Sequence, residues 1–172
     1  MIRDLNADEI ECKVKSVTES GCQLLLYKTA RTDAKILDEV YGQMNWKNKY
    51  EEIKGNIYCT IELWDPEKKQ WIPKQDCGVE NEYGDTNNKK KAEASDAFKR
   101  AGFKVGIGVE LYNSPFIWIS KDKLDKHELN NKGKWECKDK FIVSEIKTED
   151  KKIKLLRISN KKGIVYNFKI ME

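Results

Sequence analysis

The sequence lacks any apolar run that approaches the roughly 20 residues needed to cross a bilayer. Its first residues, MIRDLNADEIE, are acidic and carry no apolar stretch of the kind found in secretory signals. Whole-chain disorder is disfavoured too, because five Trp, seven Tyr and five Phe can fill a hydrophobic core. We therefore expect a folded cytoplasmic protein with no membrane partner.

Histidine and closely spaced cysteines are also scarce. The chain has one histidine, His127, and none of its five cysteines forms a CxxC pair. Structural zinc sites use close ligand pairs and hydrolytic triads need a suitably placed histidine, so the sequence predicts neither a metal site nor a triad. We expect His127 to be exposed and inert. The thiols are expected to be free and at least half-buried: Cys12, Cys22, Cys59, Cys77 and Cys137.

Net charge is concentrated in one segment. The chain has a net charge of +4, and residues 86–104 alone hold six basic and two acidic side chains, so the rest balances to zero. A neutral protein with one basic helix is suited to hold a polyanion at one place. From composition alone, a nucleic-acid-binding helix and an ordinary solvated helix face are about equally supported. The basic residues are Lys89, Lys90, Lys91, Lys99, Arg100 and Lys104.

Hydrophobic periodicity predicts an α+β fold in which an antiparallel sheet, made of a hairpin and a three-stranded meander, packs against the long basic helix. Alternating residues indicate a hairpin over 10–29, and helical spacing follows over 30–42, with Thr32 or Asp33 as its N-cap. A three-stranded meander is expected next, over 46–53, 57–64 and 70–79.

The basic helix is expected over about 87–105, with Asp85 or Thr86 as its cap and Gly106 and Gly108 at its end. Its apolar residues fall on one arc that would dock on the sheet, which leaves the positive charge along the rims of that arc. The docking residues are Ala94, Ala97, Phe98, Ala101 and Val105.

A polar stretch separates this region from the end of the chain. Residues 120–134 are rich in Lys, Asp and Asn and are typical of a linker. Three more strands are expected, over 141–147, 153–159 and 164–170. The predicted organisation is a core at 1–119, a polar linker at 120–134 and a small C-terminal β-meander extension at 135–172.

Carboxylates and aromatics leave two further interpretations open. A metal-dependent nuclease would use a carboxylate cluster, and Glu62 and Asp76 on facing strands are the pair to suspect, although solvated surface carboxylates are commoner. Exposed aromatics can stack with bases, although most large aromatics belong to a core or a subunit interface. The aromatics in question are Tyr41, Trp46, Tyr50, Tyr58, Trp64 and Trp71.

Several short motifs follow one another between residues 37 and 116 in an order that a known protein family shares. LDEVYG at 37–42 and NW at 45–46 precede the strands IYCTIELW and PKQDCGVE. The basic helix then carries SDAFKRA at 95–101, and GIG, LY and PF follow at 106–108, 111–112 and 115–116. With this order, the region from about 10 to 119 resembles the single-strand annealing proteins of the Rad-fifty-two type. That family includes eukaryotic recombination mediators and phage Sak-type recombinases.

The resemblance implies ATP-independent binding of single-stranded DNA and annealing of complementary strands in homologous recombination or phage DNA repair. It implies no cofactor, metal or bond-making chemistry, so the chain is not expected to be an enzyme. It also implies a homo-oligomeric ring or filament whose positive groove holds the DNA backbone inward and the bases outward. The Lys- and Asn-rich composition favours a bacterial cell or a phage-infected host. For residues 135–172, a host single-strand-binding protein is one partner to consider, and covering a sheet edge is another role.

The resemblance also assigns candidate DNA-binding positions. The family's basic groove residues on this helix fall on Lys99 and Arg100, and Lys91 matches another basic position. Phe103 occupies a further basic position of the family, with Lys104 beside it. The full predicted set is Lys99, Arg100, Lys91, Lys104, Lys90, Arg31 and Lys13. The alternatives are a monomeric nucleic-acid-binding module without annealing activity, a metal-dependent nuclease, and an interaction protein whose basic helix binds an acidic partner.

Overall fold

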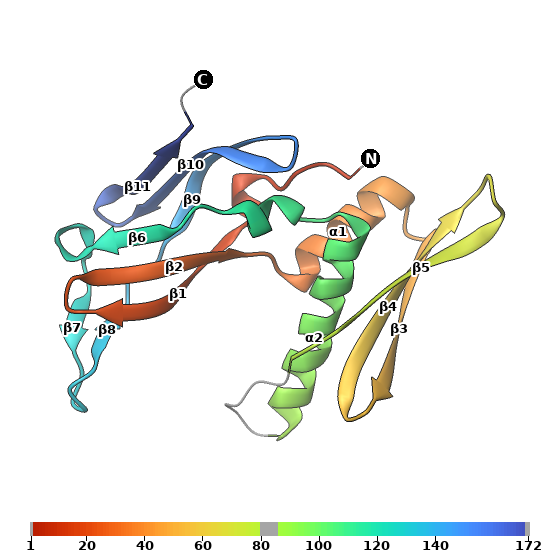
Figure 1. Ribbon diagram of the computed structural model, residues 1–172, viewed down its shortest axis with the longest axis horizontal. Helices are drawn as coiled ribbons and strands as arrows, with labels where there is room; N and C mark the ends of the chain where they lie inside the picture. The colour runs from red at the N-terminus through yellow and green to blue at the C-terminus, as the bar shows by residue number, and fades with distance from the viewer. Residues whose placement is uncertain (1, 80–85, 171–172) are drawn as a thin grey trace. The chain divides into compact units, whose positions relative to one another are not determined.

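The computed structural model describes residues 2–79 and 86–170, and it has an α+β fold with mostly antiparallel sheets, as predicted (Figure 1). The chain divides into two compact units. Unit 1 comprises Met1–Arg3 and Lys28–Gly108, and unit 2 comprises Asp4–Tyr27 and Val109–Glu172. Within the described residues, neither helix has the length and apolar character required to span a membrane.

Unit 1 holds both α-helices and a three-stranded meander. Helix α1 is Ala30–Tyr41 and helix α2 is Thr86–Val105; strands β3, β4 and β5 are Trp46–Ile53, Asn56–Asp65 and Gln70–Cys77. The strands pair antiparallel in the order β3-β4-β5, so the predicted helices and the predicted meander are confirmed.

The N-cap of α1 differs from the prediction. The Thr29 hydroxyl accepts the Thr32 backbone N–H, so Thr29 caps the helix and neither Thr32 nor Asp33 does. Asp33 lies one turn further on and is fully buried, where its carboxylate serves a different contact described below. At the start of α2, Asp85 lies outside the described residues. Gly106, with φ of 111°, follows the last residue of that helix, as expected.

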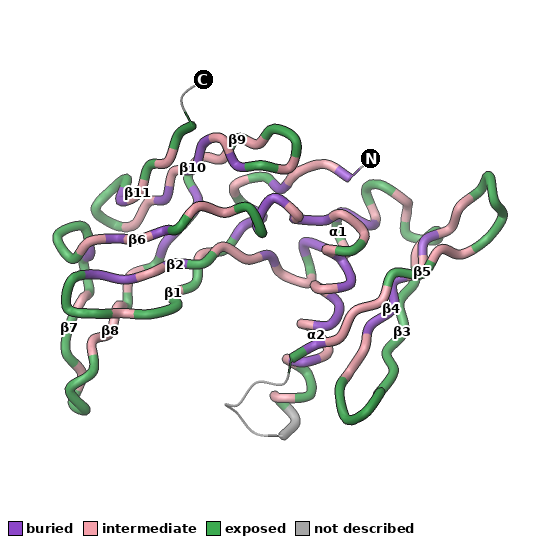
Figure 2. The backbone as a smooth tube through the Cα atoms, viewed as in Figure 1, coloured by how far each residue is buried: buried purple, intermediate pink, exposed green. Residues whose placement is uncertain are grey.

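Helix α2 docks on the meander through its small residues. Ala97, Phe98 and Ala101 are buried, and the Phe98 ring lies 6.1 Å from the ring of Trp46 on β3. Ala94 and Val105, which were also expected in this contact, are half-buried. Strand β4 is the most buried of the three strands, whereas β3 is exposed along almost all of its length (Figure 2).

Unit 2 is built on a six-stranded sheet with the strand order β11-β10-β9-β1-β2-β6. Strand β11 also contacts β6, and the Tyr166 hydroxyl donates a hydrogen bond to the Phe116 carbonyl (3.0 Å), so the two edge strands approach each other. The strands are β1 (Glu11–Thr18), β2 (Gly21–Tyr27), β6 (Ile117–Ser120), β9 (Ile142–Glu149), β10 (Lys152–Asn160) and β11 (Gly163–Lys169). Three short 3-10 helices belong to the same unit: η1 (Ala7–Glu9), η2 (Val109–Asn113) and η3 (Lys121–Lys123).

The compact units do not follow the predicted segmentation into 1–119, 120–134 and 135–172. The prediction that the N-terminal hairpin shares a sheet with the meander β3–β5 is wrong, since the two belong to separate sheets. Hairpin β1–β2 joins the C-terminal strands instead, because Glu11 on β1 pairs with Ile142 on β9. Buried residues from both ends of the sequence, such as Leu24 and Leu156, lie in the same unit. The last strands are therefore an integral part of unit 2 and not an added element.

The stretch at 120–134 is also more ordered than a linker. It contains η3 and strand β7 (His127–Leu129), which pairs with β8 (Trp135–Cys137). His127 is half-buried rather than exposed, its ring stacks on Trp135 at 4.7 Å, and its Nε2 lies 2.7 Å from the Thr18 carbonyl. With its proton on Nε2, His127 donates to that carbonyl and fastens the β7–β8 hairpin to β1.

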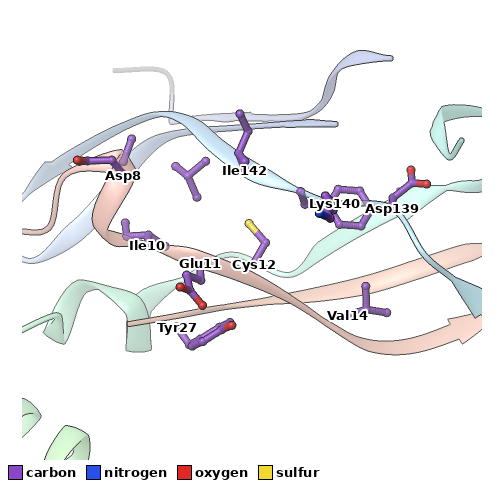
Figure 3. Close-up of a pocket in the computed structure, with 12 residues that line it drawn as sticks. Asp8, Ile10, Glu11, Cys12, Val14, Tyr27, Asp139, Lys140 and Ile142 are labelled. Atoms are coloured by element: carbon purple, nitrogen blue, oxygen red, sulfur yellow. The ribbon is translucent and has the colours of Figure 1, made fainter. Parts of the chain in front are cut away.

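Strands β1 and β9 pair only at Glu11 and Ile142 among the described residues, and a pocket of about 700 Å³ lies where they diverge (Figure 3). Its lining is mainly apolar and includes Ile10, Val14 and Phe141. Cys12 also lines it, and burial raises the pKa of this thiol to about 12, so the thiol is protonated at neutral pH. All five cysteines are free and buried or half-buried, as expected.

Candidate nucleic-acid interface

The first half of α2 presents lysines to solvent. Lys90 and Lys91 are exposed and Lys89 is half-buried. None of the three forms an ion pair with a residue that the structure describes. Their charges are thus available to an external anion.

The basic residues in the second half of α2 are held by carboxylates of unit 1. Arg100 Nε and Lys104 Nζ lie 3.7 and 3.6 Å from the two oxygens of Asp76 on β5, and Lys104 also donates to the Gln75 carbonyl (2.9 Å). Lys99 Nζ lies 3.7 Å from Asp96 Oδ1, one turn earlier on the same helix. These distances are long for ion pairs with direct hydrogen bonds, so the side chains are oriented while part of their charge stays unneutralised.

The two acidic residues of α2 turn toward the meander. The Glu93 carboxylate is buried and accepts the Ile57 backbone N–H on β4 (2.8 Å). Asp96 accepts the Val79 N–H (3.2 Å). Glu93 is therefore withdrawn from the solvent-facing side of α2, whereas the half-buried Asp96 stays beside Lys99. That side of the helix is more basic than the sequence count of six against two suggests. The close approach also depends on Gly78, where a Cβ would lie 2.2 Å from the Glu93 carbonyl oxygen.

A buried ion pair fixes the backbone beneath Lys99. Lys28 Nζ lies 2.6 Å from Asp33 Oδ2 and donates to the Lys99 carbonyl (2.9 Å), with the Phe103 ring centroid 4.2 Å away. Burial raises the pKa of the Asp33 carboxyl to about 6, against the opposing effect of Lys28, so the carboxyl is ionised at neutral pH. Gly102 lies against this pair, and a Cβ there would be 3.0 Å from Asp33 Oδ2.

Sequence reasoning missed this pair because Lys is rarely buried. Lys28 follows strand β2, where a charged residue is typical of an exposed loop. Asp33 lies in the first turn of α1, where an acidic residue is typical of a helix cap. The fully buried state of both side chains depends on the docking of α1 against α2, which no local pattern reveals.

The remaining predicted residues lie on other elements. Arg31 is exposed on α1 in unit 1, and Lys13 is exposed on β1 in unit 2, where it pairs across the strands with Leu25. The structure therefore brings five of the seven predicted positions onto one helix, namely Lys90, Lys91, Lys99, Arg100 and Lys104.

The suspected carboxylate pair is not formed. Asp76 pairs with Cys59 and Glu62 pairs with Pro73, so the two carboxylates stand at positions of opposite parity and project from opposite faces of the meander. Glu62 binds Lys47 (3.0 Å), whereas Asp76 faces Arg100 and Lys104. Within residues 2–79 and 86–170, no group of three His, Cys, Asp or Glu side chains is arranged to hold a metal ion.

No family model, curated protein or solved structure matches this chain. The features that bear on function are the sequence motifs and the geometry of α2 and its surroundings.

Proposed function

We propose that this protein binds single-stranded DNA and anneals complementary strands without ATP, as a homo-oligomer whose DNA contacts lie on the exposed side of α2. The observation that carries the proposal is the basic surface of α2, on which Lys90, Lys91 and Lys104 are exposed while Glu93 is buried against β4. Such a surface binds phosphates without reading sequence, which is what an annealing protein requires.

The order of elements supports the same proposal. A hairpin, a helix, a three-stranded meander and a long basic helix follow one another along the chain. That is the order in which the sequence resembles the single-strand annealing proteins. Packing of α2 on the meander also fixes the helix backbone, so its basic positions keep constant spacings for contacts with phosphates.

Annealing itself needs two physical effects. First, basic groups reduce the repulsion between the two phosphate backbones. Second, an oligomer repeats the same modest positive charge on every subunit, so many weak contacts together give tight binding. Backbone contacts leave the base edges free to pair, so neither ATP nor bond-making chemistry is required.

The test is ATP-free annealing of two complementary DNA oligonucleotides by wild type and by Lys99→Ala/Arg100→Ala. A matched control, Lys47→Ala/Lys49→Ala, removes the same charge from the face of the meander that carries Glu62. We expect fast annealing by wild type and the control, and loss of annealing by the α2 variant. Light scattering of the same samples reports whether each is an oligomer and remains one.

A folded wild type that does not accelerate annealing would overturn the proposal. Binding of DNA by a monomer without annealing would favour the simpler nucleic-acid-binding module. Magnesium-dependent cleavage of the oligonucleotides would favour the nuclease.

A further inference from the structure

Unit 2 carries a pair of parallel aromatic rings, one exposed and one half-buried. Phe116 and Trp118 have ring centroids 6.5 Å apart and planes within 6° of each other, and Phe116 is 68% exposed. A single exposed ring is ordinary on a protein surface, but an exposed ring beside a second, parallel ring forms an apolar patch that a flat ligand can cover.

The strand register shows what surrounds these rings. Trp118 pairs with Gln23 on β2, and the last pair of this register is Leu24 with Ile117. Continued by one residue, the register would set Phe116, which precedes β6, beside Leu25, which is itself 43% exposed. Paired residues share one face of an antiparallel sheet. One row of that face is therefore Lys13, Leu25 and Phe116, and the next is Ser16, Gln23 and Trp118.

The polar members of this face suit a nucleic acid. Lys13 and Lys15 are exposed and form no ion pair with a described residue. Gln23 can offer an amide to a base edge, and its Oε1 lies 3.5 Å from the Ser16 hydroxyl. Glu11, the nearest acid on β1, shares a hydrogen bond with the Tyr27 hydroxyl. That carboxylate keeps its negative charge, but it stands one row beyond Lys13, on the side away from Trp118. Lys13 and Lys15 outnumber Glu11, the one acid of β1, so the charge of this strand favours a polyanion.

We propose that the β1–β2–β6 face of unit 2 is a base-stacking platform for single-stranded nucleic acid, with Phe116 and Trp118 under the bases and Lys13 at the phosphates. This inference rests on the proposed function and adds a second contact surface to it. Stacking on an exposed ring is tolerant of sequence, because every base has a π-face, so the platform fits a protein that must accept any strand. It also gives Lys13 a role in unit 2 that does not depend on α2.

The test measures the affinity of the full-length protein for oligothymidylate and for an abasic oligomer of the same length, by fluorescence anisotropy at one salt concentration. The variants are Phe116→Ala, Phe116→Leu and Lys99→Ala/Arg100→Ala. Phe116→Leu keeps the apolar surface and removes only the aromatic plane, so it separates stacking from general apolar contact. Because Phe116 is exposed, both Phe116 variants should melt within a few degrees of wild type.

We expect both Phe116 variants to bind oligothymidylate at least about fivefold more weakly and to bind the abasic oligomer as wild type does. Equal affinity of Phe116→Leu and wild type for oligothymidylate would overturn the platform, and so would equal weakening toward both oligomers. A change of oligomeric state in Phe116→Ala without a base-dependent loss would assign the face to protein contacts and overturn it too. The α2 variant should bind both oligomers more weakly. If the α2 variant binds both oligomers as wild type does, the proposed DNA site on α2 is wrong. The comparison of the Phe116 variants with wild type still tests the platform in that case.

Discussion

The ammonium of Lys28 and the carboxylate of Asp33 form an ion pair inside unit 1, with side chains 1% and 0% exposed. The ammonium also reaches the Lys99 carbonyl, so a charged pair carried by the chain before and within α1 holds the backbone of α2. A buried pair of this kind contributes little compared with an apolar pair of similar volume, but loss of one partner leaves an uncompensated charge.

Removal of one partner should therefore be far more harmful than removal of both. We expect Lys28→Met and Asp33→Leu each to lower the free energy of unfolding by about 3–5 kcal/mol, and the double variant to be clearly more stable than either. Urea denaturation followed by Trp fluorescence measures all four proteins. If the double variant loses the sum of the two single losses in free energy of unfolding, the two side chains are not energetically coupled. That result would contradict the buried ion pair as the cause.

For Gly102→Ala, helix propensity predicts a gain in stability, whereas packing predicts a loss. Replacement of a helix-interior Gly by Ala normally stabilises by about 1 kcal/mol. At Gly102 the added Cβ would lie 3.0 Å from Asp33 Oδ2 and 3.1 Å from Lys28 Nζ, atoms that are fixed by each other and by the Lys99 carbonyl. We expect Gly102→Ala to destabilise by about 1–3 kcal/mol in thermal or urea unfolding. A gain in stability would mean that the ion pair shifts at little cost.

Asp76 should restrain DNA binding by α2. Its carboxylate lies near both Arg100 and Lys104, so Asp76→Asn removes a negative charge from beside two predicted phosphate contacts. We expect roughly 2- to 10-fold tighter binding of single-stranded DNA at low salt, with a smaller difference at high salt. Glu62→Gln is the matched control, because it makes the same charge change on the opposite face of the meander. Weaker binding by Asp76→Asn alone would instead show that Asp76 positions the two basic side chains.

Asp4 should give part of the acid sensitivity of unit 2. Its partial burial opposes ionisation, but hydrogen bonds from Lys151 (2.5 Å) and Thr148 outweigh that effect and lower the pKa of Asp4 below its usual 3.8. A lowered pKa stabilises the fold above pH 3.8 and loses that contribution as pH falls through the lower folded value. We expect Asp4→Asn to cost about 1 kcal/mol at pH 7 and almost nothing near pH 2. A cost that is independent of pH would assign Asp4 a purely steric role.

The sequence predicted the elements of this protein better than their assembly. Alternation and helical spacing are local, and they located both helices, the meander and the terminal strands. The pairing of Glu11 with Ile142 joins the two ends of the chain, and nothing in either strand specifies its partner. The β7–β8 hairpin escaped prediction because it is polar, with a turn held by hydrogen bonds of the Asn130 side chain.

The candidate site shows the same division. A helical wheel predicted that the basic residues lie along the rims of the docking arc of α2, and Arg100 and Lys104 do lie beside Asp76 on β5. It did not reveal that Glu93 turns inward to the Ile57 N–H, or that Asp76 lies opposite Arg100. Those contacts depend on the distance and register between a helix and a sheet, and both are set by tertiary packing.

The integration of the C-terminal strands into unit 2 predicts which amides lose protection from hydrogen exchange when a core residue is replaced. Leu156 on β10 is fully buried, so Leu156→Ala should cost about 2–5 kcal/mol. If unit 2 unfolds cooperatively, hydrogen exchange should accelerate at the amides of β1 and β2 as well as at those of β9–β11. Ile61→Ala, an equally buried change on β4, should instead accelerate exchange in unit 1. Faster exchange confined to β9–β11 in Leu156→Ala would contradict a shared core and restore the C-terminal strands to the status of an appendage.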